Sequence, residues 1–284
     1  MNYRHGFHAG NHADVLKHVA LLAICDALTA KPAPIFALDT HAGRGLYQLT
    51  GDQATRTGEA EGGIGRLRRG LDPAIDRYLD AVAACRARDG GDAYPGSPWL
   101  LAYALRAQDR IAACELQAEE AHALKANFAD EPRIAVHARD GYAAMKALLP
   151  PRFGDTRFNR GLVLVDPPFE AQLAEFDVAF GAVREGLERW PQGCFALWYP
   201  VKQARALASA MRRAAAMPAK SALRLELHVR PDDSPLRMNG SGLAVWNPPW
   251  RLDAALTPAL AALAGALGEG GPGRAIVEWL RAPD

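Results

Sequence analysis

Short apolar runs that end in an acidic or turn residue recur along this chain of 284 residues. The clearest is Leu162–Val165, which leads directly into Asp166, two prolines and Phe169. A continuous apolar run of this length suits a strand buried on both faces, as in a parallel sheet. The prolines end such a strand and stiffen the backbone behind the aspartate. We therefore predict a carboxylate and an aromatic ring at the carboxyl end of a central strand, where open α/β sheets bind ligands. An ordinary strand-to-loop junction is the alternative.

Similar runs predict the rest of the sheet, and amphipathic stretches between them predict helices. The predicted strands are 34–39, 111–115, 133–137, 194–199 and a hairpin of 223–229 with 243–246. The predicted helices are 11–28, capped by Asn11, and 99–107, 118–128, 142–149 and 202–217. Strands that alternate with helices are typical of an α/β fold with a mostly parallel sheet.

A glycine loop follows the first predicted strand, and the acid expected after it is displaced. In a βαβ unit that binds a nucleotide, the acid that contacts the ribose lies ~20 residues beyond the glycines. The best candidate, Glu115, lies much further from Gly45, and the full GxGxxG fingerprint is absent. The additional residues, about 47–93, are rich in Arg, Gly and Asp, and their apolar residues have helical spacing from Ile64 to Val82. We therefore expect an inserted helical subdomain at 47–93, within a main domain of 1–46 and 94–284 whose first 30 residues form an arm and a helix.

The main domain restarts at Ser97, which precedes Pro98 and is predicted to cap the next helix. If so, the backbone amides near Ser97 are placed to receive the charged end of a cofactor. A further acid, Asp140, follows the third strand of the chain, where it could reach a purine amino group or only form a turn.

Charge and composition narrow the class of protein. The net charge is only +1, yet 202–230 holds seven basic residues against one acid, which indicates a footprint for nucleic acid or a solvated helix face. The four cysteines are scattered without a CxxC pair, which is typical of reduced thiols in a cytoplasmic protein. There is no apolar signal-peptide core and no run long enough to cross a membrane. We therefore expect a cytoplasmic protein with no membrane partner.

Four of the eight histidines lie in the first 18 residues. His8 and His12 are four residues apart, but neither a Glu nor a Cys completes a metal set, so we expect no metal. An exposed arm rich in Tyr, His, Arg and Lys suits base stacking and phosphate contact instead. The candidate RNA-binding residues are Tyr3, Arg4, His5 and Lys17.

A second Pro-Pro motif, Asn247–Trp250, competes with Asp166–Phe169 as the chemical site. It follows the last strand of the predicted hairpin. If that strand is antiparallel to its neighbours, its end faces away from the ligand edge, and Asp166 is favoured.

Together these motifs resemble a class I, adenosylmethionine-dependent methyltransferase. Asp166–Phe169 is similar to the (Asn/Asp)-Pro-Pro-aromatic motif of enzymes that methylate amino groups. More narrowly, the chain resembles the bacterial 23S rRNA adenine-N6 methyltransferase family. The stretches that carry this likeness are 3–18, Asp39–Gly43, Tyr94–Pro98, Leu197–Pro200 and Asn247–Trp250. The family usually has Tyr where this chain has Phe169. The resemblance implies a Rossmann-like fold with a mostly parallel seven-stranded sheet, a C-terminal hairpin strand and the insert.

The resemblance also implies a chemistry. Asp166 accepts a hydrogen bond or the proton of the adenine N6 group, the Pro167 carbonyl accepts a second hydrogen bond, and Phe169 stacks on the base. Tyr3 meets the RNA, with His5 and Lys17 nearby. S-adenosyl-L-methionine is the implied methyl donor, with no metal, and its implied contacts are His18, His41, Ser97, Glu115, Asp140, Gly141 and Asp166.

The expected partner is 23S ribosomal RNA, free or in early assembly, and the chain is expected to act as a monomer. Two alternatives stay open from the sequence. A DNA adenine-N6 methyltransferase shares the Asp-Pro-Pro-Phe motif, although no separate target-recognition domain is evident. A non-enzymatic RNA-binding protein, or a hydrolase that uses His8 and His12 with a metal, would not need adenosylmethionine.

Overall fold

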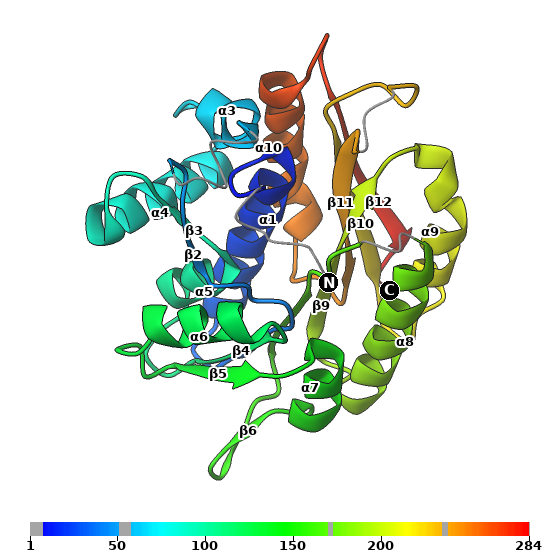
Figure 1. The fold of residues 1–284 in the computed structure, drawn as a ribbon. Helices are drawn as coiled ribbons and strands as arrows, with labels where there is room; N and C mark the ends of the chain where they lie inside the picture. The colour runs from blue at the N-terminus through cyan, green and yellow to red at the C-terminus, as the bar shows by residue number, and fades with distance from the viewer. Residues whose placement is uncertain (1–7, 51–57, 170–172, 235–237, 284) are drawn as a thin grey trace.

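The computed structural model describes residues 8–50, 58–169, 173–234 and 238–283. Its main sheet is built from β1 (Phe36–Asp39), β4 (Arg110–Glu115), β5 (Ile134–Ala138), β8 (Gly161–Val165), β9 (Cys194–Val201), β10 (Ala222–His228), β11 (Gly240–Trp246) and β12 (Arg274–Arg281). The order across the sheet is β12-β10-β11-β9-β8-β1-β4-β5 (Figure 1).

The five strands from β5 to β9 are parallel neighbours, while β11 runs antiparallel to β9 and β10, and β12 runs antiparallel to β10. The predicted α/β fold with a mostly parallel sheet and a C-terminal hairpin is confirmed. The prediction of seven strands is wrong, because β12 adds an eighth at the edge of the described sheet. This strand pairs on one side only and is at most half-buried, and Glu278 interrupts its apolar residues, so it lacks the continuous apolar pattern of a buried strand such as β8.

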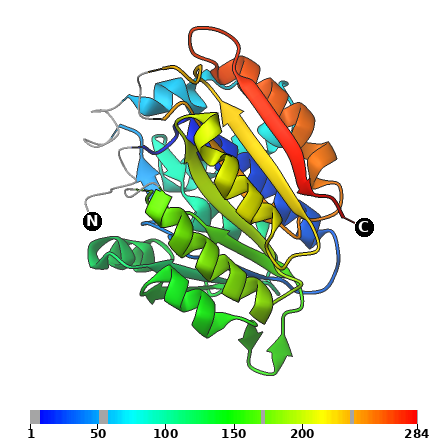
Figure 2. The same cartoon turned by 90° about the vertical axis from the view of Figure 1, so that its right-hand side faces the viewer.

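Helices cover both faces of the sheet and explain why its central strands are continuously apolar. One face packs against α1 (His12–Thr29), α5 (Ser97–Ala104), α6 (Ala118–Asn127) and α10 (Leu252–Leu267). The other packs against α7 (Gly141–Leu148), α8 (Leu173–Arg189) and α9 (Ala208–Ala215), which lie over it in Figure 2. In β8, Leu162 and Leu164 enter the first core, while Val163 and Val165 enter the second. No helix within the described residues is long and apolar enough to cross a membrane.

The chain leaves the sheet between β1 and α5. A small hairpin of β2 (Leu46–Gln48) and β3 (Ala93–Pro95) joins this inserted segment to the rest of the chain. Between these two strands the segment contains α3 (Glu59–Gly62), the short 3-10 helix η2 (Ile64–Arg66) and α4 (Pro73–Asp89). The helical spacing from Ile64 to Val82 does not form one helix. Gly70 adopts a positive φ of 84°, and Asp72 then caps α4 by accepting a hydrogen bond from Ala74 N. The division of the chain into 1–46 with 94–284 and the insert 47–93 stays a prediction.

The remaining elements are a two-stranded hairpin of β6 (Arg152–Phe153) and β7 (Thr156–Arg157) and a short 3-10 helix, η3 (Ala204–Leu207). The hairpin precedes the start of β8 and lies at the end of the molecule opposite α3 (Figure 1). The predicted helix 202–217 is divided between η3 and α9.

Candidate active site

The site lies where the chain reverses its direction across the sheet. From β1 the chain continues to β4 and β5 on one side, and from β8 it continues to β9 on the other. Ligands bind at the carboxyl ends of strands beside such a switch point. Asp39 ends β1, Asp166 follows β8, Glu115 ends β4 and Asp140 follows β5. The fold therefore brings the three predicted acids, together with Asp39, to one edge of the sheet.

The Asp166 carboxylate is held by a lysine from α1. Lys17 Nζ donates to Asp166 Oδ2 at 2.6 Å and lies 2.9 Å from Asp14 Oδ1. Asp14 is fixed in turn by the backbone N–H of Gly10, which donates to its Oδ2 at 3.0 Å. Asn11 caps the helix as predicted and accepts from Ala13 N and Asp14 N. The result is a buried row of carboxylate, ammonium and carboxylate that ends at the candidate catalytic oxygen.

Burial makes Lys17 a poor candidate for a direct RNA contact. Its side chain is 5% exposed, and that of Asp14 is 3% exposed. Burial by itself lowers the pKa of Lys17, but the attraction of Asp14 and Asp166 outweighs it and raises that pKa well above its ordinary value. An ammonium held between two carboxylates cannot also reach a phosphate on the surface. The structure thus gives no support to a direct RNA contact by Lys17, and its assignment to the RNA-binding arm stays a prediction. The i, i+3 spacing of Asp14 and Lys17 on one helix face indicates in the sequence that they pair, but it does not indicate that the ammonium is buried.

Glu115 holds the glycine loop against the end of β4. Its Oε2 accepts from Gly43 N at 2.9 Å, and its Oε1 accepts from Gln117 N at 2.7 Å. Burial raises the pKa of Glu115, and these two hydrogen bonds offset part of that shift. A carboxylate in this position, with lone pairs beyond those it uses, can accept from ribose hydroxyls.

Ser97 begins the next helix instead of capping it. The N-cap is Gly96, whose N–H donates to Gly45 O at 2.9 Å. A Cβ on Gly96 would lie 3.1 Å from the Gly45 backbone, so the glycine loop and the start of α5 need this close approach. The insert therefore separates two segments in sequence that remain in contact in space. The buried Ser97 stands at the first turn of α5, where backbone amides attract negative charge.

His41, Asp140 and Gly141 line the neighbouring strand ends. The His41 ring meets Tyr142 edge-on at 5.1 Å, and burial lowers its pKa to about 4, so the imidazole is neutral at physiological pH. Asp140 caps α7 by accepting from Ala143 N at 2.7 Å. A Cβ on Gly141 would lie 2.0 Å from Thr40 O, so only glycine allows this contact between the two loops.

Asp39 is a buried acid to which the sequence gave no role. It is fully buried, and its Oδ1 accepts from His41 N at 3.2 Å. Its Oδ2 has no hydrogen-bond partner among the described residues, although the Ser97 hydroxyl lies near the carboxyl. Burial raises the pKa of Asp39 to about 6. At this one group the folded protein therefore binds more protons than the unfolded chain between about pH 4 and 6, so the contribution of Asp39 to stability falls as pH rises through that window. A carboxylate whose charged form is disfavoured by burial is a candidate for binding a cation.

His18 lies behind the site on α1 and is fully buried. Its Nδ1 is 3.1 Å from the Tyr94 hydroxyl, which is 2.8 Å from the hydroxyl of Tyr78 on α4. The structure thus places this predicted cofactor contact in a polar chain that ties α1 to the insert.

Phe169 stands beside Asp166 on aromatic support. Its half-buried ring lies 4.9 Å from Phe176 and 5.9 Å from Trp198, measured between centroids, and meets both at tilted or edge-on angles. Trp198 was not among the predicted site residues, and its indole Nε1 has no hydrogen-bond partner among the described residues. These two rings fix the orientation of Phe169, which allows it to serve as a platform for a flat group.

Three of the four predicted RNA-binding residues, Tyr3, Arg4 and His5, lie outside the described residues. His8 Nδ1 lies 3.0 Å from Glu59 of the insert, and Asn11 Nδ2 donates to the same carboxylate. In the described ranges, no group of three or more His, Cys, Asp or Glu side chains is placed to hold a metal ion.

The rival Pro-Pro motif is at the wrong edge of the sheet. Trp246 at the end of β11 pairs with Phe195 at the start of β9, so Asn247 lies opposite the strand ends that carry Asp166. Asn247 instead joins loops by accepting from Lys220 N and donating to the carbonyls of Pro191 and Gly193. The expectation from strand direction is therefore correct.

The basic stretch 202–230 is less open to a polyanion than its charge indicated. Within the part of the chain that the structure describes, three of its seven basic side chains form ion pairs with acids, and two of these three pair with an acid outside the stretch. The pairs are Arg213–Asp177, Arg224–Glu226 and Arg230–Glu269.

Known proteins are similar to this chain in sequence and in fold over nearly its whole length. The family model for ribosomal RNA large subunit methyltransferase D, RlmJ, matches residues 32–281. The chain is 38% identical over 285 residues to ribosomal RNA large subunit methyltransferase J of Haemophilus influenzae. It is 37% identical over 282 residues to the protein of that name in Escherichia coli K12. Each match covers 99% of both chains. Protein LPL1258 of Legionella pneumophila, known from a crystal structure, is 29% identical with a TM-score of 0.84 over 95% of this chain and 98% of its own. The fold is thus the Rossmann-like class I methyltransferase fold that the sequence predicted. The chain belongs to the RlmJ family of ribosomal RNA large subunit methyltransferases.

Proposed function

We propose that this protein transfers a methyl group from S-adenosyl-L-methionine to the exocyclic N6 of one adenine in 23S ribosomal RNA. The observation that carries the proposal is the Asp166–Phe169 motif at the switch point, with one carboxylate oxygen held by Lys17 and an aromatic ring beside it. Its relatives are named for methylation of ribosomal RNA of the large subunit. An acceptor and a flat apolar surface side by side suit an aromatic ring that carries an amino group.

The strand ends that surround Asp166 fit adenosylmethionine. We assign Glu115 to the ribose hydroxyls and Asp140 to the purine amino group. We assign Asp39 to the amino acid ammonium, because its Oδ2 is an acceptor without a partner in the described residues. Gly141 allows its loop to lie against Thr40, and His41 adds a neutral ring. We assign the remaining contacts to His18 and Ser97. The bound cofactor supplies a methyl group on a sulfonium, and no metal is required.

The protein's own residues act on the target amino group. The N6 lone pair of adenine is delocalised into the ring, so the nitrogen is a poor nucleophile. Hydrogen bonds from the amino group to Asp166 and to the Pro167 carbonyl favour a tetrahedral nitrogen with a localised lone pair. Lys17 occupies Oδ2 and so leaves Oδ1 for the base. Asp166 then accepts the proton as charge develops on nitrogen, a contribution of ~10²–10⁴ for a general base. Phe169 holds the ring by stacking, and Tyr3, Arg4 and His5 contact the RNA.

Transfer of labelled methyl groups to nucleic acid tests this proposal. The purified protein should label 23S rRNA from cells that lack it, and nucleoside mass spectrometry should find the label as N6-methyladenosine. Duplex and single-stranded DNA form the second arm of the assay. Label in DNA alone would support the DNA methyltransferase, and label in neither would support a protein that only binds RNA. The cytoplasmic location, the monomeric state and the use of free or early-assembly RNA stay predictions.

Cofactor binding should weaken in mild acid because Asp39 becomes protonated. With a pKa of about 6, Asp39 is charged at pH 8 and mostly neutral at pH 5. If its charge pairs with the cofactor ammonium, the Kd measured by calorimetry should rise about tenfold per pH unit below pH 6. Asp39→Asn should weaken binding at pH 8 and flatten this dependence, leaving a smaller slope that belongs to Glu115. A Kd that is constant from pH 8 to 5 in the unchanged protein contradicts the pairing.

Phe169 should contribute to RNA binding through its ring alone. Phe169→Ala removes a stacking surface worth ~1–3 kcal/mol, so the KM for RNA should rise by about 5–150-fold. Phe169→Tyr keeps the ring and should stay within about twofold of the parent. Phe153→Ala, at an exposed ring of the β6–β7 hairpin, is the matched control. Equal KM values for Phe169→Ala and the control would remove stacking from the mechanism.

A further inference from the structure

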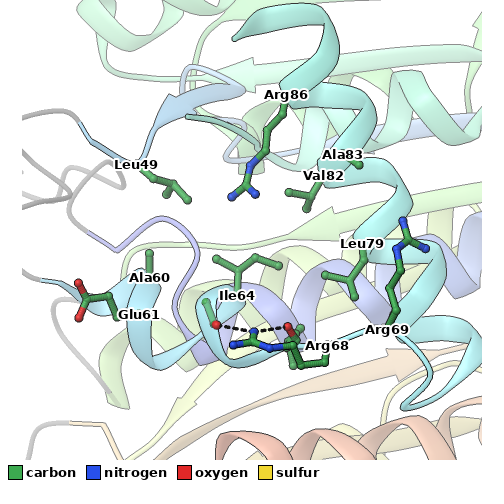
Figure 3. Close-up of a pocket in the computed structure, with 12 residues that line it drawn as sticks. Leu49, Ala60, Glu61, Ile64, Arg68, Arg69, Leu79, Val82, Ala83 and Arg86 are labelled. Carbon is green, nitrogen blue, oxygen red and sulfur yellow. Dashed lines mark hydrogen bonds between the residues drawn. The ribbon is translucent and has the colours of Figure 1, made fainter. Parts of the chain in front are cut away.

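A hollow of about 750 Å³ lies on the insert, and the residues that line it include none of the acids at the strand ends around Asp166. Its walls are mostly apolar and come from both ends of the insert, as Figure 3 shows; they include Leu49, Ala60, Ile64, Leu79, Val82 and Ala83. Pockets of ~300–1,000 Å³ accept molecules of the size of a nucleotide.

Arginines give the hollow a positive rim. Arg68, Arg69 and Arg86 line it, against the single acid Glu61. Arg68 donates through one nitrogen to the carbonyls of Gly65 and Leu67, and Arg69 pairs with Asp80. The guanidinium of Arg86 makes no hydrogen bond or ion pair within the described part of the chain, and Figure 3 shows this side chain reaching from α4 into the space between Leu49 and Val82. The hollow therefore offers an unused guanidinium above an apolar wall.

The hollow is joined to the helix that reaches the active site. Gly10, just before α1, contacts its walls so closely that a Cβ there would lie 3.0 Å from Ile64 Cγ2 and 3.5 Å from Leu49 Cδ2. Ile64 N also donates to Gly10 O at 2.8 Å. From the first residue of α1 to Lys17 the helix rises only ~7.5 Å. The first turns of α1 therefore connect the wall of the hollow to the lysine that holds Asp166.

We infer that the hollow binds an unpaired nucleotide of the RNA substrate at a distance from the target adenine, with its base against the apolar wall and its phosphate on Arg86. This inference rests on the proposed function, because it takes the substrate to be RNA. Sequence-tolerant recognition of single strands combines a positive rim with a surface on which a base stacks, and a guanidinium plane can supply part of that surface. Charge complementarity therefore favours a polyanion over a second protein, and the apolar wall favours an unpaired base over a duplex.

Two variants test the two halves of this site. Arg86→Glu should raise the KM for an in vitro transcript of 23S rRNA about 5–10-fold and lower the salt dependence of binding by about 0.7 in log–log slope, the value for one single-strand phosphate contact. Ala83→Trp fills the hollow without a change of charge and should weaken RNA binding about fivefold. Both effects are measured as KM and as direct binding of labelled transcript, with thermal melts and adenosylmethionine calorimetry to confirm the fold.

Arg157→Glu is the matched control, because Arg157 is an exposed arginine of the β6–β7 hairpin at the opposite end of the molecule. The inference is overturned if Arg86→Glu weakens RNA binding no more than Arg157→Glu does. It is also overturned if Ala83→Trp has no effect, since charge alone would then account for Arg86. The proposed function fails separately, if the unchanged protein transfers no methyl group to the transcript.

Discussion

Asp166→Asn is expected to lower kcat for methyl transfer to 23S rRNA by ~10²–10⁴-fold, the range for loss of a general base. Asparagine keeps the shape of the side chain and can still accept a hydrogen bond from Lys17, so the fold should survive. It cannot take the proton from the target nitrogen. Single-turnover transfer of labelled methyl at saturating RNA and cofactor measures the change directly.

Asp177→Asn supplies the control for this substitution. Asp177 lies on α8, is 71% exposed and pairs with Arg213 at the surface. Its loss should leave kcat within twofold, because an exposed pair contributes little. If Asp166→Asn and Asp177→Asn have equal rates, Asp166 has no catalytic role and the chemistry must be sought elsewhere on the sheet edge.

Lys17→Met is expected to destabilise the protein by about 3–5 kcal/mol, since it removes the ammonium from between two buried carboxylates. For a chain of this size that loss lowers Tm by roughly 10 °C. Methyl transfer should also fall, because Asp166 Oδ2 loses the donor that orients it. Thermal melts and the labelled-methyl assay measure the two effects on the same preparation.

The double variant Asp14→Asn/Lys17→Met separates stability from positioning. It removes the charge that Lys17→Met leaves behind at Asp14, so it should recover much of the lost Tm while methyl transfer stays low. A double variant that is no more stable than Lys17→Met would show that the buried pair is not the source of the loss. Recovery of full activity would show that Lys17 does not position Asp166.

Buried ionic groups of this kind contribute less to stability than to geometry, because desolvation offsets most of their attraction. In this protein the row from Asp14 to Asp166 joins the start of α1 to the end of β8, and His8 and Asn11 join the same region to Glu59 of the insert. The start of α1 is thus connected to the candidate catalytic motif on one side and, through Gly10 and Ile64, to the hollow on the insert on the other.

The sequence by itself determined the parts that depend on neighbours along the chain. The apolar run before Asp166 predicted a central strand, its prolines predicted the strand end, and Asn11 predicted the start of α1. Strand direction was enough to place Asn247 at the far edge. These features follow from local backbone sterics, capping and alternating burial, all of which act over a few residues.

Only the tertiary structure decided which charges meet. Lys17 and Asp166 are 149 positions apart, and nothing in the local pattern shows that the ammonium is buried instead of exposed to RNA. The same holds for Arg213 and Arg230, whose acids lie outside the basic stretch, and for Asp39, whose raised pKa comes from burial among three strands. The physical reason is that desolvation and ion pairing depend on the path of the whole chain, whereas strand and helix signals depend on the residues beside them.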